Sequence, residues 1–135
     1  MIGLDTNVVV RYLVQDDPKQ SGQANHMIEK AVAEGETLGI SQMTLCETVW
    51  VLERCYSVRK QEIVNLLKQL LQTQHLWIEH DLVAWQALRD FESNAGVDFS
   101  DCLIGRQNAF NECSFTYTFD KIAAKKLHVS FKLIR

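Results

Sequence analysis

Short apolar segments alternate with longer amphipathic segments along the whole chain, and this alternation constrains the fold more than any other feature of the sequence. Five segments have the length and the apolar or β-branched residues typical of strands: 2–5, 37–41, 76–80, 114–119 and 128–134. The intervening segments have helical apolar spacing or helix-start signals: 7–14, 16–35, 41–57, 58–74, 81–96, 98–113 and 121–127. Strands that alternate with helices usually pair in parallel, so the sequence predicts an α/β fold with a mainly parallel β-sheet.

The length and composition predict one domain over residues 1–135. The chain contains no linker, repeat or low-complexity segment. No stretch approaches the roughly 18 apolar residues of a membrane span, and the N-terminus lacks the basic and apolar regions of a secretory signal. We therefore expect a cytoplasmic protein with no membrane association.

The cysteines and histidines do not form a recognisable site. No C-x-x-C pair is present, and no histidine pair stands at zinc spacing from a cysteine. Apolar neighbours in the sequence favour reduced thiols within the core for all four cysteines: Cys46, Cys55, Cys102 and Cys113.

Acidic residues recur where a predicted strand ends. Asp5 ends the first strand and is followed by Thr6 and Asn7, and Asp120 follows the fourth strand, two residues after Thr118. Either aspartate is also a good N-cap for the helix that follows, which is the alternative interpretation. Because the carboxyl ends of parallel strands lie at the same edge of a sheet, we expect these acids to lie close together.

Two more aspartates begin the predicted helix 98–113. Asp98 and Asp101 are three residues apart, on one side of the first turn. A capping box is the alternative, although Glu or Gln is usual at its third position. Two short acids at this spacing suit a hard cation better.

Glu47 lies in the predicted helix 41–57 on a mostly apolar face, which it shares with Met43, Trp50 and Val51. A glutamate in such surroundings needs a partner for its charge. The alternative is a position at the edge of that face, with an ion pair to Arg54.

Several carboxylates at one sheet edge would repel each other. A like-charged pair 4 Å apart costs about 4 kcal/mol at an effective dielectric constant near 20, so the cluster requires cations. Oxygen ligands without histidine or thiolate favour Mg²⁺, or Mn²⁺, over zinc.

The net charge of the chain is −3, but the residues other than the five acids carry +2. A polyanionic substrate is therefore compatible with the composition. Candidates to contact phosphates are Lys121, Lys125, Lys126, Arg11 and Arg106. A solvated helix face is the alternative for the lysines.

Four segments, in this order, resemble the signature acids of PIN-domain ribonucleases: "IGLDTN", "SQMTLCETVWVL", "DFSDCLIG" and "TFDK". The small size and the opening residues resemble the VapC type, the toxin half of bacterial toxin–antitoxin pairs. The resemblance spans essentially the whole chain. It implies a three-layer fold with a central, mainly parallel β-sheet flanked by helices.

Carried over residue by residue, the resemblance assigns the catalytic acids and metal ligands: Asp5, Glu47, Asp101 and Asp120. Asp98 becomes an auxiliary ligand or a helix cap. Thr6, Asn7 and Thr118 become polar residues behind the ligands. Gly105 departs from the alanine that often follows "LI" in this family.

The activity implied by the resemblance is Mg²⁺- or Mn²⁺-dependent endoribonuclease cleavage of RNA, leaving a 5′-phosphate and a 3′-hydroxyl. The implied partners are an RNA substrate and a cognate antitoxin, with a homodimer assembling into a larger toxin–antitoxin complex. Apolar side chains between residues 42 and 72 exceed the obvious needs of one small sheet, which is compatible with such a partner.

Three other functions compete with this hypothesis. A haloacid-dehalogenase phosphatase needs a second aspartate where this chain has Asn7, and a phosphoacceptor receiver domain needs an acidic pair after its first strand. A non-catalytic PIN-like binding module, acting with an antitoxin on operator DNA, stays open. Metal-dependent cleavage that disappears in Asp5→Asn or Asp101→Asn distinguishes an enzyme from that module.

Overall fold

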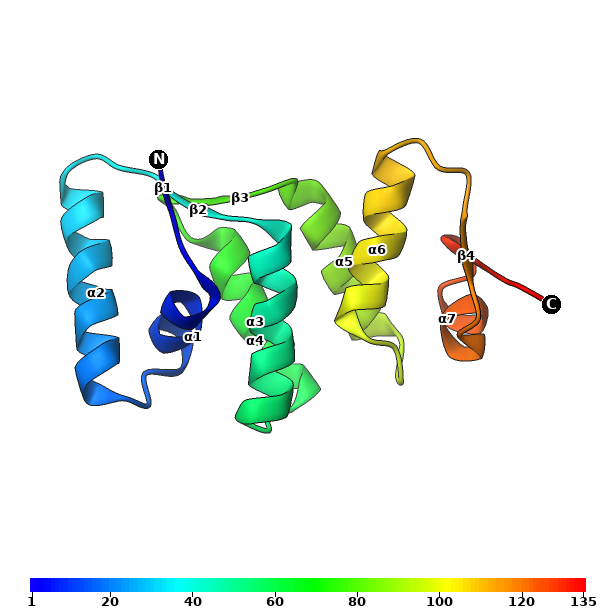
Figure 1. Cartoon of the computed structure of the whole chain (residues 1–135), viewed down its shortest axis with the longest axis horizontal. Helices are drawn as coiled ribbons and strands as arrows, with labels where there is room; N and C mark the ends of the chain where they lie inside the picture. The colour runs from blue at the N-terminus through cyan, green and yellow to red at the C-terminus, as the bar shows by residue number, and fades with distance from the viewer. The chain divides into compact units, whose positions relative to one another are not determined.

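The computed structural model describes residues 1–135, and its elements confirm the predicted α/β class (Figure 1). The chain forms seven helices and five strands, one or two helices separate each strand from the next, and every strand pairs in parallel with a neighbour. The chain divides into two compact units, Met1–Asp81 and Leu82–Arg135. No helix combines the length and the hydrophobicity needed to cross a membrane.

The first unit is built on three strands in the order β1-β2-β3: β1 (Ile2–Gly3), β2 (Leu38–Ile40) and β3 (Leu76–Ile78). Its helices are α1 (Thr6–Val14), α2 (Pro18–Ala33), α3 (Gln42–Cys55) and α4 (Lys60–Gln72). Leu38 and Ile40 of the middle strand have no exposed surface, so β2 is the centre of this unit's core. Leu67 and Leu70 of α4 are buried in the same unit.

Local signals fix the ends of α2 as the sequence predicts. The Asp17 carboxylate accepts hydrogen bonds from the backbone N–H groups of Lys19 and Gln20, and Pro18 occupies the first position. Gly35 follows the helix with φ +78°, a conformation that costs glycine little.

The second unit contains α5 (Asp81–Ser93), which begins at the boundary, and then α6 (Phe99–Phe110), β4 (Thr116–Thr118), α7 (Lys121–Lys126) and β5 (Phe131–Leu133). The strands β4 and β5 pair with each other in parallel. Phe91 and Phe99 join α5 to α6 through an edge-to-face contact, with ring centroids 5.7 Å apart. The ion pair between Arg106 and Asp90 joins the same two helices, with N···O distances of 2.6 and 2.8 Å.

Helix α6 packs closely on the residues that begin β5. A Cβ atom added at Gly105 would lie 2.8 Å from a ring carbon of Phe131 and 2.9 Å from Cβ of Ser130. These distances are shorter than normal contacts, so only glycine fits this position without a shift of its neighbours.

All five predicted strands are present, but each is only two or three residues long. Several residues at their predicted ends are used as helix caps instead. Asp5 is the N-cap of α1, and Ser41 accepts a hydrogen bond from the N–H of Thr44 at the start of α3. The cap geometry ends the strand and begins the helix within one or two residues.

The prediction of four core thiols is wrong for two cysteines. Cys102 is buried and Cys46 is half-buried, but Cys55 and Cys113 are exposed, and none of the four forms a disulfide bond. Cys55 is the last residue of α3, and Cys113 lies three residues beyond α6. At helix ends, apolar neighbours in the sequence face other directions and do not imply burial.

Candidate active site: two groups of carboxylates

In the first unit, Thr6 connects the two acids predicted there. Its backbone N–H donates to Oδ1 of Asp5 at 2.7 Å, and its hydroxyl donates to Oε1 of Glu47 at 2.7 Å. Thr6 is buried, whereas Asp5 and Glu47 are exposed. One buried residue at the start of α1 therefore holds two carboxylates that are 42 residues apart in the sequence, one through its backbone N–H and one through its hydroxyl.

The surroundings of Glu47 differ from the prediction. Met43 and Trp50 on its face of α3 are 77% and 55% exposed, so the apolar face around Glu47 is not a buried one. The buried residues of α3 lie on other positions of the helix: Leu45, Thr48, Val49 and Leu52. The alternative pairing with Arg54 is also wrong, because its guanidinium lies over the Trp50 ring, 5.8 Å from the centroid.

Asn7 stands next to this acid pair. It is exposed and, with Asp5, lines an open cleft of about 370 Å³ between α1 and α2. Arg11 lines the same cleft but donates hydrogen bonds to Gln20 and Asp16, which hold its guanidinium.

In the second unit, Asp98 and Asp120 lie close enough to Asp101 to influence the ionisation of its carboxyl. Asp101, in the first turn of α6, is half-buried. Burial raises the pKa of its carboxyl above the ordinary 3.8, and the negative charges of Asp120 and Asp98 raise it further. No basic group opposes this shift, so Asp101 lies in a region of concentrated negative charge.

The structure confirms the helix-cap interpretation for Asp120 but not the capping box of Asp98 and Asp101. Asp98 is the N-cap of α6 by position, but its side chain accepts no capping hydrogen bond, and no capping box forms with Asp101. Asp120 does cap α7, through Oδ1, which accepts from the N–H groups of Ile122 and Ala123. The Thr118 hydroxyl in turn accepts from the N–H of Asp120 at 2.9 Å.

Three of the candidate acids accept hydrogen bonds, and each of these three uses only one of its two carboxylate oxygens. Oδ2 of Asp5, Oε2 of Glu47 and Oδ2 of Asp120 are not engaged. Within neither unit do three Asp, Glu, His or Cys side chains lie close enough to hold a metal ion. The donor chemistry nevertheless suits a hard divalent cation, because all the available atoms are carboxylate oxygens and Asp101 bears uncompensated repulsion.

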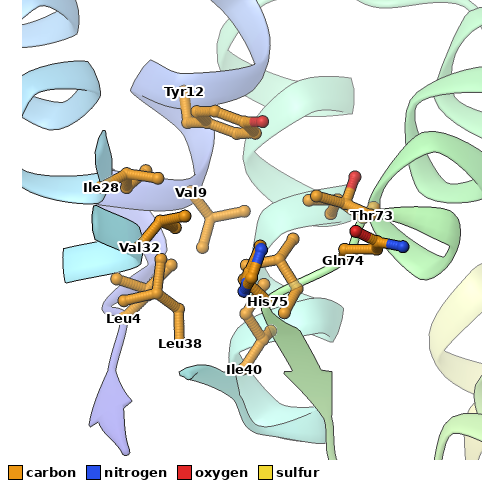
Figure 2. Close-up of a pocket in the computed structure, with 12 residues that line it drawn as sticks. Leu4, Val9, Tyr12, Ile28, Val32, Leu38, Ile40, Thr73, Gln74 and His75 are labelled. Atoms are coloured by element: carbon orange, nitrogen blue, oxygen red, sulfur yellow. The ribbon is translucent and has the colours of Figure 1, made fainter. Parts of the chain in front are cut away.

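A mainly apolar cavity of the first unit lies elsewhere (Figure 2). Its volume is about 110 Å³, and its lining is mainly aliphatic, with Tyr12 on one side and Gln74 and His75 on another. No carboxylate lines it. We interpret it as a packing cavity and not as part of the candidate active site.

The candidate phosphate contacts also change in the structure. Arg106 is held by Asp90, and the Lys126 ammonium donates to the carbonyl oxygen of Ala95 at 2.6 Å. Lys121 and Lys125 instead line an open cleft together with residues that the sequence analysis did not select: His128, Lys132 and Arg135. The absence of any acid after Asp120 was the signal that would have identified them.

Comparison with known proteins identifies a family for the chain. A search of curated proteins gives no match to this chain. The family model described as PIN domain matches residues 2–126, which include both groups of carboxylates. The chain therefore belongs to the PIN domain family.

Proposed function

We propose that the protein is a metal-dependent endoribonuclease that hydrolyses RNA phosphodiester bonds. The observation that carries the proposal is the position of Asp101, half-buried beside Asp98 and Asp120 with no basic group to offset its charge. A fold has little reason to keep such repulsion for stability alone, and a bound cation would relieve it. Membership of the PIN domain family supports the same function.

The acids have distinct roles in this proposal. Asp5, Glu47, Asp101 and Asp120 hold Mg²⁺ or Mn²⁺, and Asp98 is an auxiliary ligand. When bound, the cation lowers the pKa of water and neutralises charge on the scissile phosphate.

Polar residues behind the ligands set their positions. Thr6 donates hydrogen bonds to one oxygen of Asp5 and one oxygen of Glu47, which leaves the second oxygen of each carboxylate to bind the metal ion. Thr118 holds the backbone of Asp120 in place, and Asn7 is a further polar group beside Asp5.

The finer assignment is the toxin of a VapC-type toxin–antitoxin pair. The small size and the opening residues "MIGLDTN" support it. In this assignment the protein is a cytoplasmic homodimer that binds a cognate antitoxin in a larger complex. The exposed apolar side chains of α3, Met43 and Trp50, are available for such contacts.

The test is cleavage of total bacterial RNA by the purified protein, with Mg²⁺ or Mn²⁺ and with EDTA. Discrete cuts should depend on the metal, leave a 5′-phosphate at each mapped end, and disappear in Asp5→Asn and in Asp101→Asn. Glu29→Gln, which removes an exposed acid of α2 outside both groups, is the matched control and should cleave normally.

Two results would contradict the proposal. Cuts of equal strength in Asp101→Asn would point to a contaminating nuclease. No cuts with either metal, together with normal folding and retained binding of an antitoxin, would favour the non-catalytic binding module.

A further inference from the structure

Residues 121–135 have a charge unlike that of the rest of the chain. They contain five basic residues and no acid, whereas the nine Lys and Arg and 17 Asp and Glu of residues 1–120 give a net charge of −8. A segment this basic in an acidic chain concentrates positive potential on one part of the second unit.

Most of these charges converge on one cleft. It has a volume of about 550 Å³ and lies between α7 and β5, with Lys121 and Lys125 on the helix and Lys132 and Arg135 on the strand and just after it. No acidic side chain lines it. Lys126, on the same helix, is excluded from the cleft because it donates to the carbonyl oxygen of Ala95.

An aromatic surface adjoins the cleft through Lys132. This residue is paired in register with Tyr117 of β4, so both side chains stand on the same face of the two-stranded sheet. The Lys132 ammonium lies 4.1 Å from the Phe115 ring centroid, and Phe115 meets Tyr117 edge-to-face at 5.0 Å. Tyr117 is 63% exposed, which is unusual for so large an apolar ring that already has aromatic support on one side.

We propose that the α7–β5 cleft and the Tyr117 face together bind a single-stranded segment of RNA. The lysines contact its phosphates, and a base stacks on the Tyr117 ring. The inference rests on the proposed nuclease function and names how its substrate is held.

The chemistry of the surface favours a single strand over a duplex or an acidic peptide. Positive charge alone attracts all three, but an exposed aromatic ring beside the charge adds affinity only for unpaired bases, whose faces are free. The cleft is also next to a candidate ligand in the chain, because Lys121 directly follows Asp120.

The test measures binding of a fluorescent, unstructured RNA 20-mer in EDTA, where no hydrolysis is expected, at several salt concentrations. The double variant Lys125→Gln/Lys132→Gln should bind about tenfold more weakly, and its salt slope should fall by about 0.7 for each phosphate that the side chains no longer neutralise. Tyr117→Ala should also bind about tenfold more weakly, with an unchanged salt slope, because stacking releases no counterions. Lys126→Gln makes the same type of charge change outside the cleft and should bind like the wild type.

A duplex of the same sequence completes the design. It should respond to the lysine variant but not to Tyr117→Ala. If the lysine double variant binds RNA as tightly as Lys126→Gln, the cleft does not bind the phosphates. If Tyr117→Ala binds single-stranded RNA normally, no base stacks on the Tyr117 ring. Thermal melting of each variant identifies any that fail to fold, in which case Lys125→Gln alone is used.

The outcome is separable from that of the proposed function. Asp101→Asn should bind the 20-mer normally in EDTA while losing cleavage. A lysine variant that both binds and cleaves RNA like the wild type would contradict only the proposed binding cleft, because the nuclease activity would remain. A wild-type protein that binds RNA through the cleft but never cleaves it would overturn only the nuclease.

Discussion

Asp101 shows how a fold can hold a carboxylate under electrostatic stress. Its pKa is raised first by burial and then by the charges of Asp120 and Asp98. A raised pKa means that the ionised carboxylate is less stable in the folded chain than in the unfolded chain. Asp101 therefore contributes most to the free energy of unfolding when its carboxyl is protonated.

The sign of this effect gives a pH prediction. The stability associated with Asp101 is fully present below the ordinary pKa of 3.8 and is lost as the pH rises through the higher folded-state value. At pH 7 without metal, Asp101→Asn should have a higher melting temperature than the wild type. The gain in the free energy of unfolding should be less than about 1 kcal/mol, because the carboxyl is partly solvated. Melting curves from pH 3 to pH 8 in EDTA should show this gain shrinking toward acid pH. A gain that grows toward acid pH would contradict the raised pKa.

Thr6 gives a prediction about activity. Thr6→Val keeps the shape of the side chain but removes the hydrogen bond to Oε1 of Glu47. We expect a 10- to 100-fold loss of RNA cleavage, about the cost of losing a group that orients a metal ligand. Thr6→Ser, which keeps the hydroxyl, should recover most of the activity.

A second buried threonine provides the control for Thr6. Thr48 donates only to the backbone carbonyl of Thr44 within α3, so Thr48→Val should lower the melting temperature without a specific loss of cleavage. Equal losses of activity in Thr6→Val and Thr48→Val would show that the effect is one of stability alone.

At the scale of elements, the contact of α6 with β5 sets a strict limit on side-chain size. Gly105 lies in the middle of a helix, where alanine would ordinarily stabilise the chain by up to about 1 kcal/mol. Here the added methyl group would meet Ser130 and Phe131 at less than 3.0 Å. The glycine at position 105 therefore has a packing reason.

This contact predicts the effect of Gly105→Ala on stability. The overpacking should exceed the gain in helix propensity, giving a net loss of about 1–2 kcal/mol. Urea unfolding of the wild type and the variant measures the difference. Gly22, in α2, has open space around it, so Gly22→Ala is the matched control and should stabilise the protein.

The sequence predicted the elements better than their lengths. Apolar periodicity located every strand and helix because burial of one face follows directly from it. Strand ends were not predictable, because Asp5 and Ser41 each suit a strand end or a helix cap, and both serve as caps. Cys55 and Cys113 were misjudged because distance along the chain is a poor measure of surroundings near a helix end.

The sequence indicated which residues are candidates for the site, but not which contacts they make. The spacing of Asp98 and Asp101 indicated that they are neighbours, whereas the hydrogen bond from Thr6 to Glu47 spans 41 positions and leaves no local signal. The face shared by Tyr117 and Lys132 depends on the register of β4 with β5, which the sequence does not specify.

At the scale of the whole molecule, the proposed function makes Asp5 and Asp101 parts of one reaction. Asp5→Asn and Asp101→Asn should each lower cleavage more than about a hundredfold, beyond the usual cost of losing a supporting group. The double variant should be no less active than the less active single variant, because residues that act as a unit are not additive. Single-turnover cleavage of one mapped site measures all three, and multiplied losses in the double variant would indicate independent activities.

The close approach at Gly105 also restricts how this sequence can change over time. A larger residue at position 105 becomes acceptable only where the Phe131 ring and the Ser130 side chain both make room for it. In a family of such chains the three positions should therefore vary together, with the volume at 105 rising only where the volumes at 130 and 131 fall. A lineage that fixes alanine at 105 is expected to have passed first through smaller side chains at 130 and 131.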